Sequence, residues 1–522
     1  MTNYDLYEST SDETKRYLDM VFSLLRYFDE NGRHIKEDEI LPFSFFLAGL
    51  KTDEFVRDTF ESFGITFDNC FSFLEEVEVP FELRRANETS EFATYRLEDI
   101  YKVILPEIKR DYYLEQLIKR EGNGLIKVVT GIRRCGKSYL LRTLFKTYLL
   151  ENGVDEKHII EMAFDLFDNI EYRDPKIFYP WAKEQIQDDE KYYFLLDEVQ
   201  LLDEFVSVLN GLADKKNCDV FVTGSNAKFL SRDIATEFGG RGDEVHMYPL
   251  SFSEFMSCYD GNKYDGWNEY ITYGGIPLVV LAETDEQKMN LLDNLFQEAY
   301  ISDIVKRNKI RNVGEMESLL DVLASAIGTL TNPNKLQKTF KSANNSRITA
   351  TTITKYIEYL EDAFLIEEAN RYDIKGKSYI GTPLKYYFMD MGLRNSRIHY
   401  RQTEVTHSME NVIYNELRMR GFQVDVGNLT VVEKGKDAKP VKKQLEVDFI
   451  CNKGSKKYYI QSAYMLETET KIAQEIRPFL KINDSFKKMV ITSNTPKPFY
   501  NDQGILIMNV YDFLLNVDSL EL

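Results

Sequence analysis

Apolar residues follow two spacings along the chain, one typical of buried strands and the other typical of amphipathic helices. Between residues 122 and 250, short apolar runs precede longer stretches in which apolar residues recur every three or four positions. Strands that alternate with helices in this way predict a parallel sheet covered by helices on both faces, which is an α/β fold class. The predicted strands are Leu125–Thr130, His158–Phe164, Tyr192–Asp197 and Asp219–Thr223.

The 522-residue chain is too long for one hydrophobic core, so we expect several domains. Helical periodicity predicts an all-α N-terminal domain over residues 1–75, and the polar stretch 76–100 predicts a linker. The remaining segments predict an α/β core over 101–250, a helical segment over 251–310, three helices and a hairpin over 311–395, and a second α/β unit over 396–522.

The segment GIRRCGKS, residues 131–138, fits the phosphate-loop pattern G-x-x-x-x-G-K-[ST] between a strand and a helix. Glycines let consecutive backbone N–H groups surround an anion, and the helix N-terminus adds partial positive charge. We expect Lys137 to reach the β- and γ-phosphates and the Ser138 hydroxyl to ligate Mg²⁺. The loop therefore predicts a site for ATP and Mg²⁺ formed by Gly131, Ile132, Arg133, Arg134, Cys135, Gly136, Lys137, Ser138 and Tyr139.

The apolar run YYFLLD ends in an acidic pair, Asp197 and Glu198, about 60 residues after the loop. Asp197 is expected to hold Mg²⁺ through water, and Glu198 to polarise the water that attacks the γ-phosphate. Glu198 alone is also consistent with an acidic residue at a helix start, without a catalytic role.

Two later loops carry candidates for contact with the γ-phosphate. Ser225 and Asn226 follow the strand that ends at Thr223, where parallel strands deliver their C-terminal ends to one crevice. Either residue could instead cap a short helix over 227–230. Arg241 is flanked by glycines and is a candidate arginine finger, acting in its own site or a neighbour's, or else a solvated loop residue.

Composition and terminal sequence indicate a cytoplasmic protein. No apolar run is long enough to span a bilayer, and the polar N-terminal sequence MTNYDLYEST is unlike a signal peptide. The five cysteines are scattered without paired spacing, which predicts reduced thiols and no zinc site. No membrane partner is expected.

Charge is unevenly distributed. The net charge of −20 argues against a protein that coats nucleic acid, and residues 1–100 hold 23 acidic and 10 basic side chains, so about −13 of it falls there. The acidic N-terminal domain is therefore a candidate docking arm for a protein partner.

Six segments follow one another in a fixed order: GIRRCGKS, YYFLLDEVQ, VFVTGSN, FGGRGDEVHMYPLSFSEF, YGGIPLVV and YISDIVKR. In this order they resemble a family of prokaryotic AAA-type ATPases. The resemblance runs from about residue 110 to 522. It implies a P-loop NTPase sheet of the ASCE/AAA type, a helical lid over 251–310, a winged helix over 311–395 and a module like PD-(D/E)xK nucleases over 396–522. Residues 1–75 resemble one repeat of the N-terminal domain of Clp-type ATPases, with a generic acidic helical domain as the alternative.

Within the expected lid, the GGIP sequence Gly274–Pro277 predicts a tight turn near the nucleotide. Asp303 and Arg307 are one helical turn apart and predict a surface ion pair, with a nucleotide-sensing role for Arg307 as the alternative.

The winged helix predicts a DNA contact through its second helix, Thr349–Leu360. Acidic residues on the same helix oppose this, and a wing that docks within the chain is the alternative. The candidate phosphate contacts are Arg347, Lys355, Arg371, Lys375, Lys377 and Lys385.

The C-terminal module keeps only part of the nuclease pattern. Glu410 on a helix and Asp448 on a strand match it, but the E-x-K position holds Gln461, Ser462 and Ala463. Loss of one carboxylate and the lysine predicts an inactive nuclease fold used for binding or docking.

Three functions remain open from the sequence. The favoured one is an ATPase whose nucleotide state drives a conformational switch on DNA or a protein partner. The alternatives are a nucleotide-gated scaffold with little hydrolysis and a metal-dependent DNA nuclease.

Overall fold

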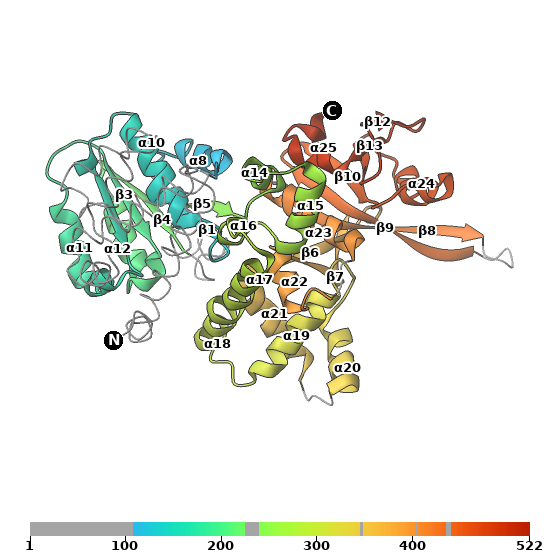
Figure 1. Cartoon of the computed structure of the whole chain (residues 1–522), viewed down its shortest axis with the longest axis horizontal. Helices are drawn as coiled ribbons and strands as arrows, with labels where there is room; N and C mark the ends of the chain where they lie inside the picture. Colours follow the sequence, from blue (N-terminus) through green and yellow to red (C-terminus); the bar gives the residue numbers. More distant parts are fainter. Residues whose placement is uncertain (1–107, 225–237, 239, 345–347, 402–403, 435–439) are drawn as a thin grey trace, which may run out of the picture. The chain divides into compact units, whose positions relative to one another are not determined.

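The computed structural model describes residues 108–522, apart from 225–237, 239, 345–347, 402–403 and 435–439 (Figure 1). The chain divides into two units, residues 1–107 and 108–522, and the account below concerns the second. The predicted N-terminal helical domain, the linker, Ser225, Asn226 and Arg347 lie outside the described residues.

A five-stranded parallel sheet forms the first half of this unit, in the order β2-β3-β4-β1-β5. The α/β prediction is confirmed. The strands are β1 Ile126–Gly131, β2 Ile159–Ala163, β3 Tyr192–Asp197, β4 Cys218–Thr223 and β5 Gly242–Met247. The helices are α8 Asp111–Ile118, α9 Lys137–Tyr139, the π-helical η3 Leu140–Phe145, α10 Lys146–Glu151, η4 Glu156–His158, η5 Phe167–Arg173, α11 Pro175–Glu184, η6 Val199–Leu201 and α12 Phe205–Ala213.

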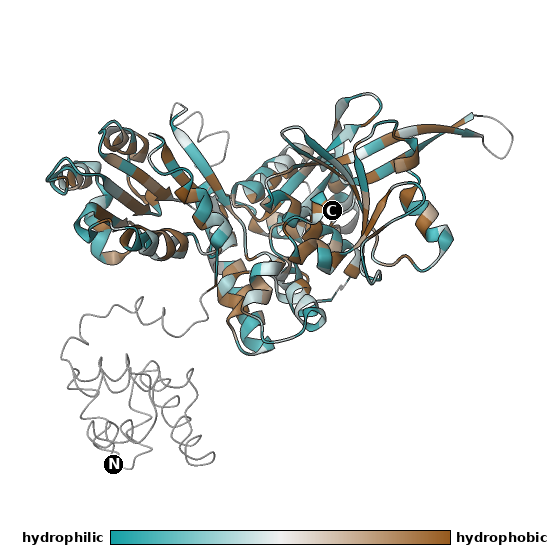
Figure 2. Cartoon of the chain, turned by 90° about the horizontal axis from the view of Figure 1, so that it is seen from above, coloured by the Kyte–Doolittle hydropathy of each residue, from teal (hydrophilic) through white to brown (hydrophobic). Residues whose placement is uncertain are grey.

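Alternating residues of β1 face two different helical layers. Ile126 and Val128 pack with the hydrophobic side chains of α11 and α12, whereas Val129 packs with those of η3. Figure 2 shows hydrophobic residues along these strands. Because both faces are covered, the strands are nearly continuous apolar runs, as parallel strands usually are.

One ion pair is buried inside this sheet. Lys127 of β1 is fully buried and pairs with Asp219 of β4, which also accepts a hydrogen bond of 2.7 Å from the backbone N–H of Gly122. Burial lowers the pKa of Lys127, because a charged ammonium loses its hydration there. The pair therefore ties β1, the strand that leads into the phosphate loop, to its neighbour β4.

Helices over 252–308 form the region predicted as the lid. Phe252, Phe255, Ile276 and Val279 are buried in this region, whereas Leu278 is exposed. The helices are α14 Phe252–Ser257, α15 Lys263–Tyr273, α16 Pro277–Val280, α17 Asp285–Asn294, the π-helical η8 Leu295–Ile301 and α18 Ser302–Asn308.

The predicted wing hairpin belongs to a second, larger sheet. Strand β6 pairs with β7 on one side and with β8 on the other, in the eight-stranded order β12-β13-β11-β10-β9-β8-β6-β7. The strands are β6 Ile366–Asp373, β7 Ser378–Phe388, β8 Gln423–Lys434, β9 Pro440–Lys453, β10 Lys456–Ser462, β11 Lys487–Thr492, β12 Phe499–Tyr500 and β13 Leu506–Asn509. The helices are α19 Val313–Ser325, α20 Pro333–Asn344, α21 Ala350–Asp362, α22 Met391–Arg397, α23 Val405–Met419, α24 Glu469–Ile476, η9 Phe479–Lys481, α25 Val510–Leu515 and η10 Ser519–Glu521.

Two of the cations expected to contact DNA phosphates are buried. Arg371 is 6% exposed and donates to the Asn428 side chain at 3.0 Å, and Lys385 is 3% exposed among carboxylates. Neither side chain is available to a DNA phosphate in this structure, so the sequence prediction is wrong for both. Lys355, Lys375 and Lys377 are exposed.

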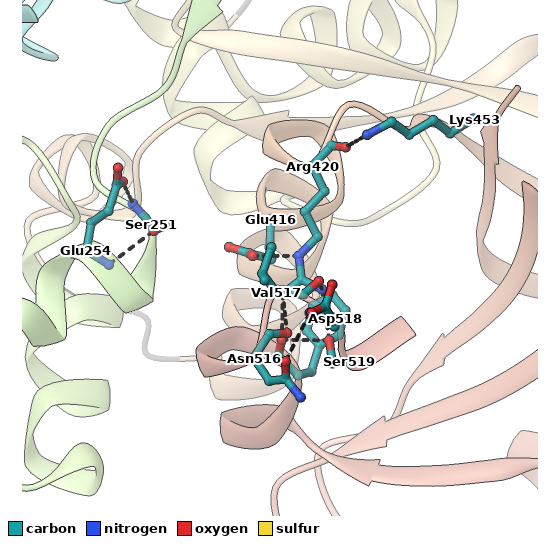
Figure 3. A network of polar contacts seen from close by, with 10 residues as sticks. Ser251, Glu254, Glu416, Arg420, Lys453, Asn516, Val517, Asp518 and Ser519 are labelled. Carbon is teal, nitrogen blue, oxygen red and sulfur yellow. Dashed lines mark hydrogen bonds and ion pairs between the residues drawn. The ribbon is translucent and has the colours of Figure 1, made fainter. Parts of the chain in front are cut away.

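Arg420, at the C-terminal end of α23, holds the end of the chain (Figure 3). Its guanidinium group binds Glu416 at 2.7 Å, the Phe513 carbonyl at 2.6 Å and the Ser519 hydroxyl at 2.8 Å. Nearby, Ser251 and Glu254 form a capping box at the start of α14. None of the described helices is both long and apolar enough to cross a membrane.

We predict that Asp219→Ala destabilises the parallel sheet by about 3–5 kcal/mol, because it leaves the buried Lys127 ammonium without its partner. Hydrogen exchange of the β1 and β4 amides, followed by mass spectrometry, measures this local change. Glu115→Ala is the matched control: Glu115 and Lys119 form an ion pair with side chains 62% and 63% exposed, so we expect less than about 1 kcal/mol. Equal effects of the two changes would contradict the prediction.

Candidate nucleotide-binding site

The loop between β1 and α9 has the backbone of a phosphate loop. Gly131 and Gly136 have φ of 137° and 99°, which side-chain-bearing residues rarely adopt. A Cβ at Gly131 would lie 2.0 Å from the Met247 carbonyl oxygen, so only glycine fits beside β5. The Cys135 thiol is fully buried and faces the same carbonyl at 3.5 Å, as a small filling residue.

Lys137 lies within this loop. Its ammonium group donates hydrogen bonds to the carbonyl oxygens of Gly131 at 3.1 Å and Ile132 at 3.0 Å, and the residue is 4% exposed. The positive charge is therefore held where the loop N–H groups and the start of the helix over 137–151 converge, which suits a phosphate.

Three oxygen-bearing side chains meet beside the loop. The Asp197 carboxylate, at the end of β3, accepts hydrogen bonds from the Ser138 hydroxyl at 3.0 Å and from the Thr223 hydroxyl at the end of β4. Burial raises the pKa of Asp197, because its charged form has lost water. A cation beside this carboxylate would stabilise its charged form.

Glu198 follows Asp197 in the left-handed backbone region, with φ of 50°. Its backbone N–H donates to the Thr223 hydroxyl at 2.9 Å, and the Gln200 side chain donates to its carboxylate. Neighbouring side chains thus orient both the backbone and the carboxylate of Glu198. A carboxylate that positions a water molecule has to be held in this way.

These residues fit Mg²⁺ bound together with a nucleotide. Magnesium in such sites takes hard oxygen ligands, usually one or two from the protein and the rest from water and phosphate. Ser138 supplies a hydroxyl and Asp197 a carboxylate oxygen. Within the described ranges, no group of three or more His, Cys, Asp or Glu side chains is arranged to hold a metal ion. Ser138 and Asp197 therefore suit a Mg²⁺ ion that takes its other ligands from phosphate and water.

The helices over 252–308, predicted as the lid, contact the loop through Arg133. The Tyr300 hydroxyl donates to the Arg133 carbonyl at 2.8 Å, and Asp303 lies 3.3 Å from the Arg133 guanidinium group. Asp303 also lies 3.6 Å from Arg307, so the ion pair predicted on the surface of one helix extends to the phosphate loop.

The GGIP turn contacts the loop on one side and α22 on the other. Pro277 would lie 3.9 Å from a Cβ at Gly136, whereas the Asp390 carboxylate accepts from the Gly275 N–H at 2.7 Å. A Cβ at Gly274 would lie 2.2 Å from the same carboxylate. Burial raises the pKa of Asp390 to about 6, against the hydrogen bonds that it accepts. The turn predicted near the nucleotide thus links the loop to α22.

Arg241 is not brought to the loop. It immediately precedes β5, where its carbonyl accepts from Ile126 at the start of β1, so it lies at the opposite end of the sheet from Gly131. Its side chain is 51% exposed and pairs with Asp214 at 2.6 Å. A finger acting in its own site is not supported by this position, and action on a neighbouring chain stays a prediction.

Three positioning residues were not found from the sequence. From the sequence, Thr223 was identified only as the end of an apolar strand. Its hydroxyl group, at the C-terminal end of a strand in the parallel sheet, is the sequence signal that could have identified it. Gln200 follows the acidic pair by two residues and could have been found by proximity. Asp390 could not, because only the fold brings α22 to the GGIP turn.

A family model described as an AAA domain matches residues 123–256, and one described as a domain of unknown function matches residues 264–404. An uncharacterized protein of Haemophilus influenzae is 35% identical over 416 residues, 78% of this chain and 98% of that protein. An uncharacterized protein of Methanocaldococcus jannaschii is 29% identical over 403 residues, 74% of this chain and 85% of that protein.

Solved structures show weaker similarity. The Walker-type ATPase paby2304 of Pyrococcus abyssi is 14% identical with a TM-score of 0.41, over 58% of this chain and 97% of that one. The Aeropyrum pernix Orc1 protein in complex with DNA is 11% identical with a TM-score of 0.24, over 58% and 95%.

We predict that Asp390 makes the folded unit less stable as pH rises from about 4 to 6. Its folded-state pKa of about 6 exceeds the unfolded value of about 3.9, so the folded chain binds more protons in this window, and its stability falls by up to about 3 kcal/mol. Unfolding curves at several pH values should show that the free energy of unfolding of wild type, minus that of Asp390→Asn, falls as pH rises from about 4 to 6.

Asp188→Asn is the control with opposite sign, because the hydrogen bond from His158 lowers the pKa of Asp188. The stability that Asp188 adds is present above its unfolded pKa and is lost as pH falls. If the free energy of unfolding of wild type minus that of Asp390→Asn instead rises with pH, the raised pKa of Asp390 is wrong.

Proposed function

The chain belongs to an AAA-type ATPase family, and we propose that it binds Mg–ATP at this site, hydrolyses it and uses the cycle to move the lid against the parallel sheet. Family membership rests on the relative of which this chain covers 98% at 35% identity, and on the AAA domain matched over 123–256. The reaction and the switch are our proposal.

The observation that carries it is the hydrogen-bonded set of Ser138, Asp197 and Thr223 beside the phosphate loop. Ser138 and Asp197 would hold Mg²⁺, which neutralises charge on the phosphates when bound. Lys137 would leave the loop carbonyls to bind the β- and γ-phosphates, and the loop from Gly131 to Tyr139 would bind them through backbone N–H groups.

Glu198 would orient the attacking water, with Gln200 and Thr223 keeping it in position. Ser225 and Asn226 remain proposed sensors of the γ-phosphate, because they follow Gly224, whose N–H donates to Val129 of β1 at 3.1 Å. Arg241 would act only on the nucleotide of a neighbouring chain.

The lid contacts give the proposed switch a physical route. Tyr300 and Asp303 hold Arg133, so a phosphate that reorganises the loop would change both contacts. On the other side of the loop, Asp390 joins the GGIP turn to α22. The partner that reads this movement is proposed to be DNA or a protein.

Docking within the chain has specific support at the predicted winged helix. Phe364, just after α21, packs against His246 of β5 with ring centroids 4.9 Å apart. Burial lowers the pKa of His246 to about 3, so this contact is between uncharged rings. This favours a wing that responds to the nucleotide domain, with DNA contact left to Lys355, Lys375 and Lys377.

We predict that Glu198→Gln lowers steady-state ATP turnover by about 10²–10⁴-fold while nucleotide binding is retained, because the amide cannot polarise water. Lys137→Ala should instead weaken ATP binding by roughly 10–100-fold. Turnover and binding of a fluorescent ATP analogue measure the two effects, each with and without duplex DNA.

Equal turnover in wild type and Glu198→Gln would remove Glu198 from catalysis and favour the nucleotide-gated scaffold. Turnover that rises with DNA would identify DNA as the partner, and unchanged turnover would favour a protein.

We predict that Tyr300→Phe combined with Asp303→Asn changes the ATP affinity by about fivefold or more, because the lid loses its hold on Arg133. The matched control is Glu269→Gln, which breaks the ion pair with Lys288 that joins α15 and α17 and leaves the Tyr300 and Asp303 side chains unchanged. Titration with ATP measures both. If the control changes affinity as much as the double variant, the route through Arg133 is wrong.

A further inference from the structure

Lys385 of β7 lies among the carboxylates of the nuclease-like module. Its ammonium nitrogen is 2.8 Å from a Glu410 oxygen, 2.8 Å from a Glu446 oxygen and 3.8 Å from an Asp448 oxygen. The Lys385 side chain is 4% exposed, and those of Glu410 and Asp448 are 8% and 10% exposed. The Glu446 side chain is 36% exposed, so three carboxylate oxygens surround one buried cation and two of them belong to buried side chains.

The cation comes from an unexpected part of the chain. In the sheet order, β7 is separated from β9, which carries Glu446 and Asp448, by β8 and β6. Glu410 belongs to α23. The lysine missing from the E-x-K position, where Ala463 stands, is thus not simply lost, because the wing hairpin supplies an ammonium group to the same carboxylates.

Glu410 and Asp448 also accept hydrogen bonds from other groups of the chain. Glu410 accepts a further hydrogen bond from the Tyr387 hydroxyl at 2.7 Å, and His407 lies 3.7 Å from its other oxygen. Asp448 accepts from the Ser462 backbone N–H at 2.8 Å. A divalent metal needs such oxygens as ligands, at much shorter distances than an ammonium group.

We propose that Lys385 is a built-in counter-ion that takes the place of a divalent metal, so that this module binds no Mg²⁺ and instead locks the β6–β7 hairpin to α23 and β9. An ammonium group has three donors and can bind the carboxylates as the metal would. It cannot activate a water molecule for phosphodiester hydrolysis. The residues therefore do not fit a metal-dependent nuclease.

The β6–β7 hairpin connects the Lys385 cluster to the phosphate loop. The hairpin that carries Lys385 leads directly into Asp390 and α22, which bind the GGIP turn beside the phosphate loop. With Lys385 in place, the hairpin and the C-terminal sheet form one body against which the lid moves. A metal in its place would make this junction depend on ion concentration.

Binding of Mn²⁺ to the full-length, nucleotide-free chain tests the proposal, with electron paramagnetic resonance of free Mn²⁺ as the readout. We expect wild type and Glu410→Gln to bind equal amounts, because the cluster takes none. Lys385→Met should gain one Mn²⁺ per chain, and Lys385→Met combined with Glu410→Gln should lose it again. Any binding at Asp197 is common to all variants.

Thermal unfolding gives an independent readout. Manganese at about 1 mM should raise the Tm of Lys385→Met more than the Tm of wild type, because binding at Asp197 contributes equally to both and only the variant gains a second site. If Lys385→Met does not fold, the comparison of wild type with Glu410→Gln decides alone. Wild type that binds one Mn²⁺ more than Glu410→Gln, or that nicks supercoiled DNA with Mn²⁺ when Glu410→Gln does not, would overturn the proposal.

Discussion

The buried carboxylate of Asp197 connects the elements on which the site depends. It lies at the end of β3 and accepts hydrogen bonds from Ser138, after the phosphate loop, and from Thr223, at the end of β4. Parallel strands make this possible, because their C-terminal ends lie at one edge of the sheet. The cost of burying a charge there is offset by two hydroxyl donors, and a metal bound with phosphate would add to them.

Backbone constraints hold the surroundings of this carboxylate. Gly131 lies so close to β5 that any side chain would collide with the Met247 carbonyl, and Gly274 lies equally close to Asp390. The phosphate loop is therefore confined between the sheet and the GGIP turn. In the proposed switch, a rearrangement of the loop on binding phosphate would be passed to the helices over 252–308 through Arg133, or to the GGIP turn.

The polar side chains in the two sheets have different surroundings. In the parallel sheet, Asp197 is buried but accepts a hydrogen bond from Ser138, which is exposed. In the second sheet, Lys385 and its carboxylates satisfy one another, so a site that resembles a nuclease centre in sequence becomes a buried ion cluster. We propose that the same residue types serve binding in one sheet and cohesion in the other, depending on whether a lysine reaches them.

The sequence by itself determined the α/β class, four of the five strands of the parallel sheet, the phosphate loop and the acidic pair, because each depends on local periodicity or fixed spacing. It missed β5, whose sequence GDEVHM is too polar to predict a buried strand. Only the tertiary structure decided that Thr223 and Gln200 orient the acidic pair, that Arg241 lies away from the loop, and that Lys385 is buried among carboxylates rather than exposed to DNA. These features depend on which strand ends and helix faces meet, and residues far apart in the sequence carry no local signal of that meeting.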